Sequence, residues 1–403
     1  GCGEADLAES YSLGRRELTA VFNTNGKPNV SGRHTFVFDI EKYSLGGNQV
    51  ASSNDVMVTS APTRSEFALD MWYVAALSAE VSDKPLARTL LNEPVVLFRT
   101  QDGQIGALED RCCHRALPLS LGTVDESGLR CGYHGLLFNC AGACIEIPGQ
   151  EKIPSKAKVT AYHAIEKGPL IWIWFGSELD SEPSCEPPEY SVHTDKRYLF
   201  DGDVYHYEAP YQLIHDNLLD LSHLGYVHAN TIGGNAKIHM NAEMKVESEG
   251  DSVRVTRYMP NSTPPPTYTA AYPFAGQVDR WQEIVFYPSH LEIWTGAVDV
   301  NTESLDDPNR GGFHLRGFHG VTPQTAETSF YIWTQASNPT NNPAETMQLV
   351  IEQTAETFDE DKVVIEAQYA NMQRFGQKAI LDIHVDVGAN RARRIIKRLI
   401  SAK

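Results

Sequence analysis

A chain of 403 residues with 41% hydrophobic side chains is long enough to bury the cores of two domains. Its 52 acidic and 34 basic residues leave a formal charge of -18, which would repel nucleic acid and anionic lipid surfaces, so we expect neither as a partner. The sequence contains no apolar run long enough to cross a bilayer and no recognisable signal peptide, which predicts a soluble, cytoplasmic protein without a membrane partner.

The first part of the chain, residues 1–66, is polar and rich in glycine, asparagine and serine. Only the segment HTFVFDI resembles a strand there. We therefore expect an N-terminal extension whose order the sequence leaves open.

Residues 67–180 contain short apolar runs separated by turn residues, among them MWYVAAL, PVVLFRT and GPLIWIWFG, and QDGQ is typical of a hairpin turn. This pattern predicts an all-β domain. The acidic, proline-bearing stretch SELDSEPSCEPPEY follows and has the composition of a linker. From 187 to 403, strand patterns mix with helical patterns near 211–228, 344–373 and 388–400, which favours an α+β domain with a mainly antiparallel sheet.

Five of the seven cysteines fall between Cys112 and Cys144, a clustering typical of metal binding in a reducing compartment rather than of a disulfide framework. Cys112 and His114 form one short pair, and after sixteen intervening residues Cys131 and His134 form a second. If the two pairs lie on the tips of neighbouring hairpins, their four side chains can share one metal site.

Zinc accepts two cysteines and two histidines, but zinc fingers place both cysteines in one arm and both histidines in the other. Here each arm carries one of each. This arrangement suits a Rieske-type 2Fe-2S cluster, which has two thiolates on one iron and two imidazoles on the other and a potential of roughly -150 to +300 mV. The Rieske cluster is our prediction, and zinc is the alternative.

The segment DNLLDLSHLGYVH, from Asp216 to His228, is the candidate for the centre that consumes the electrons. On a straight helix the side chains of His223 and His228 would point about 140° apart. We therefore expect a break or bulge at Gly225 that turns both imidazoles inward.

A carboxylate would complete the facial triad of two histidines and one acid that binds non-heme Fe(II). In the helical pattern AETFDEDKVVIEAQYANM, Asp361 shares an apolar face with Phe358 and Ile365, whereas Asp359 and Glu360 project elsewhere. Because an acid on a buried face requires a partner, Asp361 is the predicted third ligand. A buried salt bridge is the alternative for this residue.

These motifs together resemble those of the Rieske non-heme iron oxygenases, and within them the oxygenase components of vanillate and dicamba O-demethylases. The resemblance runs from about Phe67 to at least Met372. It is carried by the two cysteine–histidine pairs, by N-x2-D-x2-H-x4-H from Asn217 to His228, and by EDKVVIEAQ. It implies a Rieske domain followed by a catalytic domain of the helix-grip type.

The resemblance also implies roles for single residues. Asp220 would bridge His223 and a cluster histidine, His134, of the next subunit in a homotrimer, and Asn217 would lie beside the iron. On residue pattern alone, Asp220 could orient His223, and the two roles are compatible. His319, in the strand pattern FHLRGFHGVTP, would contact the substrate, although a buried structural histidine fits the same pattern.

The sequence contains no dinucleotide-binding glycine motif and no Walker motif. Electrons from NAD(P)H would therefore arrive through a separate ferredoxin or flavin reductase, with dioxygen as co-substrate. The predicted function is O-demethylation of a methoxylated aromatic acid by the oxygenase component of a Rieske monooxygenase. Ring hydroxylation of a small aromatic substrate is the alternative within the family. A non-catalytic Rieske electron carrier is the alternative of another class, and the predicted second iron site argues against it.

Overall fold

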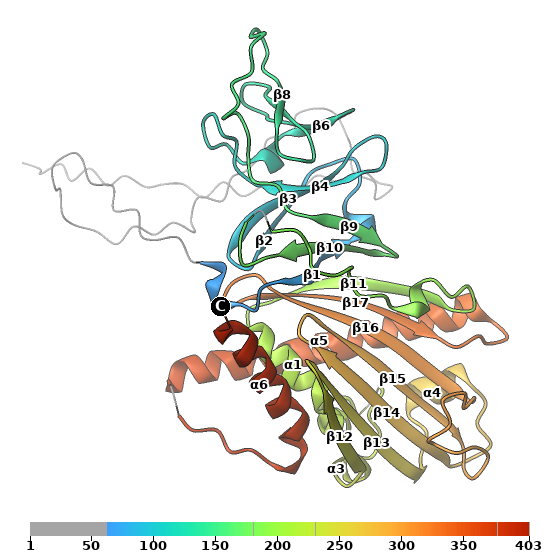
Figure 1. Cartoon of the computed structure of the whole chain (residues 1–403). Coiled ribbons are helices and arrows are strands. Elements are labelled where there is room, and N and C mark those ends of the chain that lie inside the picture. Colours follow the sequence, from blue (N-terminus) through green and yellow to red (C-terminus); the bar gives the residue numbers. More distant parts are fainter. Residues whose placement is uncertain (1–62, 180, 230, 377, 403) are drawn as a thin grey trace, which may run out of the picture. The chain divides into compact units, whose positions relative to one another are not determined.

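The computed structural model describes residues 63–179, 181–229, 231–376 and 378–402. Of the expected N-terminal extension, residues 1–66, the part from 1 to 62 lies outside the described residues. Two groups of sheets follow one another along the described chain, as Figure 1 shows.

Three small antiparallel sheets form the first group, as the apolar runs of residues 67–180 predicted. The first has the order β1 (Met71–Leu77), β10 (Leu170–Phe175), β9 (Ala164–Lys167), and the second has the order β2 (Leu86–Leu90), β3 (Glu93–Arg99), β4 (Ile105–Glu109). The third has the order β5 (Thr123–Asp125), β6 (Gly128–Arg130), β7 (Leu137–Phe138), β8 (Cys144–Glu146). Strand β10 is apolar at every position because it is central in its sheet and is buried along its whole length.

A seven-stranded antiparallel sheet forms the second group. Its order is β11 (Leu199–Tyr207), β17 (Ser329–Ser337), β16 (Phe313–Pro323), β15 (His290–Asp299), β14 (Val278–Tyr287), β13 (Ser252–Ser262), β12 (Glu243–Glu249). Consecutive strands from β12 to β17 are neighbours, and β11 adds to the free edge of β17.

Six α-helices accompany this sheet among the described residues: α1 (Tyr211–Leu219), α2 (Leu224–Val227), α3 (Ala236–Met240), α4 (Pro266–Ala271), α5 (Pro343–Phe375) and α6 (Val387–Ser401). Helix α5 packs on β11 and β17, α1 on β16 and α6 on β13, and their apolar side chains share one core with the sheet (Figure 1). The predicted α+β class, with an all-β part before an antiparallel sheet and helices, is confirmed. None of the described helices is long and apolar enough to span a bilayer.

The first small sheet and the seven-stranded sheet also share a core. Trp172 of β10 packs with Phe318 of β16 in one buried cluster, and the Thr322 hydroxyl donates to the Val74 carbonyl at 2.7 Å. The acidic stretch between the two groups lies against the first sheet, where the Trp72 indole N–H donates to the Cys185 carbonyl at 2.8 Å. The stretch with linker composition therefore joins two groups of sheets that are packed together.

Candidate metal centres and substrate cavity

Two loops, one after β4 and one between β6 and β7, carry the predicted cluster ligands, and both have the same backbone geometry. The N–H groups of Cys112 and Cys131 each donate to the carbonyl five residues later, at 2.8 Å in both loops. The residue four positions after each cysteine has a positive φ, 57° at Ala116 and 74° at Gly135. The two tight turns therefore present their side chains in a similar way.

The cluster-ligand candidates divide into a buried pair and an exposed pair. Cys112 and Cys131 are buried side by side. Burial raises the pKa of the Cys112 thiol to about 11 against a hydrogen bond from the His114 N–H, and the Cys131 thiol raises it further. His114 and His134 are exposed, with ring centroids 4.5 Å apart. The buried Cys112 thiol is therefore neutral at pH 7, and a bound cation would be needed to hold it as a thiolate.

Helix α1 ends just before the first histidine of the second predicted site. Asp220 has an extended backbone conformation, with φ -118° and ψ 90°, and its carboxylate caps the next turn by accepting from the Ser222 N–H at 2.9 Å. A short 3-10 turn, Leu221–His223, leads into α2. The break that redirects the chain therefore lies at Asp220, before His223.

The expected bend at Gly225 is wrong, because Gly225 lies inside α2. Its lack of a side chain serves packing instead: a Cβ there would lie 2.2 Å from the Cα of Ala236 in α3. The close contact between α2 and α3 thus requires glycine at this position, while the extended residue upstream supplies the change of direction.

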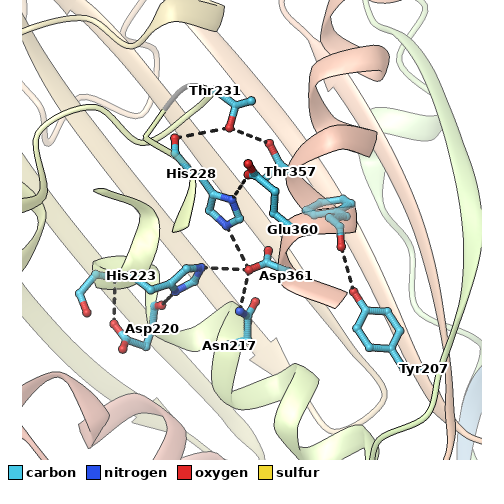
Figure 2. Close-up of polar contacts among 11 residues, drawn as sticks. Tyr207, Asn217, Asp220, His223, His228, Thr231, Thr357, Glu360 and Asp361 are labelled. Carbon is cyan, nitrogen blue, oxygen red and sulfur yellow. Dashed lines mark hydrogen bonds and ion pairs between the residues drawn. The ribbon is translucent and has the colours of Figure 1, made fainter. Parts of the chain in front are cut away.

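The three predicted iron ligands lie together, as Figure 2 shows. The Nε2 atoms of His223 and His228 lie 3.4 Å and 3.0 Å from the same Oδ1 of Asp361 in α5. His228 and Asp361 are buried, and the His223 Nε2 is buried without a hydrogen-bond partner among the described residues. Two imidazole nitrogens and one carboxylate oxygen, all within 4.8 Å of one another, form the donor set of a facial triad.

The charges within this group are set by its neighbours. Burial would raise the pKa of Asp361, but the adjacent imidazoles of His223 and His228 hold it well below its ordinary value. Burial would likewise lower the pKa of His228, but the carboxylates of Asp361 and Glu360 outweigh burial and raise it. The Asp361 carboxylate is therefore ionised at neutral pH and can serve as a donor to a cation.

Two side chains hold the three candidates in place (Figure 2). Asn217 Nδ2 donates to Asp361 Oδ1 at 2.9 Å, and Glu360 Oε2 lies 2.7 Å from His228 Nδ1. The prediction that Glu360 projects away from the site is wrong. Glu360 and Asp361 are adjacent in α5, so their side chains point about 100° apart. The His228 ring lies between them, with Nδ1 toward Glu360 and Nε2 toward Asp361.

Asp220 acts on His223 through its main chain in this structure. His223 Nδ1 lies 2.5 Å from the Asp220 carbonyl oxygen, which fixes the ring with Nε2 toward Asp361. The Asp220 carboxylate is partly exposed and lies 3.7 Å from Arg257 Nη1. The Asp220 carbonyl thus orients the His223 ring, while the Asp220 carboxylate does not contact it.

A cavity lies beside the candidate triad, and His223, His228 and Asp361 form part of its wall. Aliphatic and aromatic side chains make up much of its wall: Leu218, Leu221, Leu224, Ile232, Ile293, Leu315 and Phe358. Polar side chains of the large sheet complete it: Arg280, Gln282, Thr295, His319 and Gln335.

His319 reaches this cavity from β16 and is buried. Its Nδ1 lies 2.6 Å from the Tyr331 hydroxyl, whereas its Nε2 has no partner among the described residues. Burial lowers its pKa to about 3, so the ring is neutral. The unpartnered Nε2 of a neutral ring in the cavity wall is therefore free to contact a ligand.

Comparisons with known proteins match both groups of sheets. Residues 71–159 match the Rieske [2Fe-2S] domain, and residues 207–402 match the vanillate O-demethylase oxygenase C-terminal domain. The iron-sulfur subunit of a putative toluene-4-sulfonate monooxygenase system from Comamonas testosteroni is 38% identical over 344 residues, which cover 82% of this chain and 96% of that protein. The chain belongs to the Rieske non-heme iron oxygenases.

Two further relatives of this Rieske oxygenase are similar over most of its length. A vanillate O-demethylase oxygenase subunit from Pseudomonas sp. (strain HR199) is 34% identical, over 84% of this chain and 96% of that protein. The crystal structure of dicamba monooxygenase bound to dicamba has a TM-score of 0.74 and 31% identity, over 83% of this chain and 97% of that chain.

The cofactors of this Rieske oxygenase are a 2Fe-2S cluster and a mononuclear non-heme iron. The donor sets fit both. The first site offers two buried cysteine thiols, of which Cys112 has a raised pKa, and two exposed imidazoles. The second offers an ionised carboxylate beside an imidazole nitrogen without a partner in the described part of the chain. The enzyme is thus an oxidoreductase, the oxygenase component of a Rieske system.

Proposed function

We propose that this oxygenase removes the methyl group of a methoxylated aromatic acid. The observation that carries the proposal is the largely apolar cavity with the candidate triad in its wall. Such a cavity excludes water from a bound ring and places it next to the iron donors. Vanillate and dicamba, after which two relatives are named, are both methoxylated aromatic acids.

In this proposal each metal group has its own set of side chains. The cluster is held by Cys112, His114, Cys131 and His134, and the iron by His223, His228 and Asp361. The bound iron supplies dioxygen activation. In the overall reaction, one oxygen atom enters the methyl C–H bond and the other leaves as water, with two electrons and two protons. The resulting hemiacetal breaks its C–O bond to give formaldehyde and a phenol.

The remaining residues of the site position these groups. Glu360 and Asn217 hold His228 and Asp361 through hydrogen bonds of 2.7 and 2.9 Å, which fixes the face that the triad turns to the cavity. His319 Nε2 is available to a hydroxyl or ether oxygen of the ligand. The apolar walls keep solvent from the reacting carbon.

Electron delivery in the proposal requires partners. A separate ferredoxin or flavin reductase carries electrons from NAD(P)H to the cluster, and a cytoplasmic location suits that supply. We further propose a homotrimer in which the exposed His134 of one subunit meets Asp220 of the next. The solvent exposure of the imidazole pair and the free side of the Asp220 carboxylate support this contact.

Formaldehyde release is the decisive test. Purified enzyme loaded with both metals is given NADH, a surrogate reductase and a panel of methoxylated aromatic acids, and formaldehyde is expected in a one-to-one ratio to NADH consumed. The variant His223→Ala should keep the visible absorption of the cluster and lose turnover. Hydroxylated rings without formaldehyde would establish ring hydroxylation instead, and an iron site that stays empty under loading would favour an electron carrier.

A further inference from the structure

One end of the cavity holds a buried cation that has no anionic partner. Arg280 lies on β14, is 4% exposed and lines the cavity. Two other buried arginines are paired: Arg257 of β13 with Asp220, and Arg310, in the loop before β16, with Glu283. Arg280 forms no ion pair with any carboxylate that the structure describes.

The groups around Arg280 do not neutralise its charge. Its Nη1 and Nη2 donate to the carbonyls of Gly233 and Ile232 at 3.1 and 3.2 Å, and its Nε has no partner in the described residues. His239 Nε2 lies 2.8 Å from the same Gly233 carbonyl, and burial, followed by the nearby guanidinium, lowers the pKa of His239 to about 4. The neighbouring imidazole is therefore neutral. Among the described residues no carboxylate offsets the positive charge, which contacts two peptide carbonyls and the Tyr268 side chain.

Gln282 extends this polar end of the cavity. It is two residues further along β14, so its side chain lies on the same face of the sheet as Arg280. It is 1% exposed and lines the cavity, and both Oε1 and Nε2 lack a partner among the described residues. A buried amide without partners costs free energy. Amide and guanidinium together offer several donors to one ligand.

The strand register separates this end from His319. Arg280 pairs with Ala297, which pairs with Phe313, and His319 lies six residues further along β16. At about 3.3 Å per residue and about 4.8 Å per strand, the Cα atoms of Arg280 and His319 are on the order of 20 Å apart. The two side chains therefore line opposite ends of the cavity.

The candidate triad is linked to both ends of the cavity through residues that are close to it in the sequence. His319 packs on Phe358, one turn of α5 before Asp361, and the carbonyls that Arg280 binds follow His228 by four and five residues. Asp361 is the one acidic side chain in the described lining, and it faces the two histidines. A ligand that spans the cavity would thus meet cationic and amide donors at one end and the His319 imidazole at the other.

We propose that Arg280 and Gln282 bind the acid group of the substrate, so that the enzyme selects anionic aromatic compounds. This inference rests on the proposed function, which takes the substrate to be an aromatic acid, and it adds the residues that bind the acid group. A carboxylate and a sulfonate both supply the required anionic oxygens. A carboxamide of the same shape lacks the charge.

Binding to the anaerobic, metal-loaded enzyme tests the proposal without turnover. Isothermal titration calorimetry with 4-methoxybenzoate, 4-methoxybenzenesulfonate and 4-methoxybenzamide gives three Kd values. At least one acid should bind about tenfold or more tightly than the amide, and the tighter acid identifies the anion. Arg280→Gln should raise the Kd of that acid 10- to 100-fold, as expected for loss of a charge-assisted hydrogen bond. The Kd of the amide should change by less than about threefold.

Two matched variants separate recognition from structure. Arg280→Lys keeps the charge and should keep the preference for the acid. Arg316→Gln removes a cation on the same sheet that stacks on Trp294 and does not line the cavity, and it should leave all three Kd values unchanged. Equal Kd values for acid and amide in the unaltered enzyme, or an equal loss for both ligands in Arg280→Gln, would overturn the proposal.

The outcome for O-demethylation is separate. Selective binding of acids without formaldehyde would leave the role of Arg280 standing and refute demethylation. Formaldehyde release from neutral methoxyarenes, unaffected by Arg280→Gln, would support demethylation and refute the role of Arg280.

Discussion

Glu360→Gln tests how much of the iron affinity depends on a residue next to the ligand set. Glu360 Oε2 lies 2.7 Å from Nδ1 of the fully buried His228, whose Nε2 faces Asp361. Glutamine keeps the shape of the side chain and removes its charge, so the imidazole becomes a weaker donor to the metal. Outer carboxylates of this kind are worth roughly 10- to 100-fold in metal affinity. Because the Glu360 side chain is 34% exposed, solvent screening favours the lower end, about tenfold or about 1.4 kcal/mol.

The assay is Fe(II) competition against a colorimetric chelator, with the visible absorption of the cluster recorded in the same sample. The cluster signal should be unchanged, because Cys112 and Cys131 lie in loops of the first group of sheets, away from α5. Glu356→Gln, an exposed acid one turn earlier on α5, is the matched control and should bind iron like the unaltered enzyme. If Glu360→Gln also binds iron with unaltered affinity, the hydrogen bond to His228 does not tune the metal and the reasoning fails.

Three other perturbations follow from the geometry. Gly225→Ala should destabilise the fold by about 1–3 kcal/mol through overpacking against Ala236, which would be measured as a lower Tm. The control Gly276→Ala, with no atom within 4 Å of the added Cβ, should keep its Tm. Equal Tm values for the two variants would contradict the packing role of Gly225. Asp220→Asn should keep both metals and slow transfer from cluster to iron in single-turnover kinetics, and unchanged kinetics would exclude the bridge. Burial lowers the pKa of His215, His290 and His319 to about 3, below the ordinary 6.5, so the folded state binds fewer protons than the unfolded one. Stability should therefore fall as pH drops from 6.5 towards 3, by about 1.4 kcal/mol per pH unit for each histidine, and identical Tm values at pH 7.5 and 5.5 would contradict this.

Elements with a strong local pattern were predictable from the sequence. The alternating segment FHLRGFHGVTP coincides with β16 (Phe313–Pro323), and the long helical pattern near 344–373 is α5, which begins at Pro343 and ends before Gly376 with φ 66°. Proline at a helix start and glycine after its end are local signals. Periodicity also placed Asp361 on the buried face, because burial of a helix follows its spacing.

Features that depend on distant contacts were not predictable in the same way. The turn at Asp220 is stabilised by a local cap, whereas the requirement for glycine at position 225 comes from its contact with Ala236 of α3. The helical pattern placed Glu360 off the apolar face. It could not reveal the contact with His228, which depends on the tertiary structure. A usable signal was present in the cluster loops, where CCHRAL and CGYHGL share the spacing C-x4-L, and in both loops the cysteine N–H donates to the carbonyl of that leucine.

The buried contact between β10 and β16 has a consequence for how the molecule comes apart. Trp172 and Phe318 belong to one apolar cluster, so cutting the chain in the acidic stretch would expose that cluster on both fragments. The electron-carrying part is therefore not a detachable module, although it has its own ligands and its own sheets. On heating, the visible signal of the cluster and the occupancy of the iron site should disappear in one cooperative transition, because the side chains that separate them are shared by both halves.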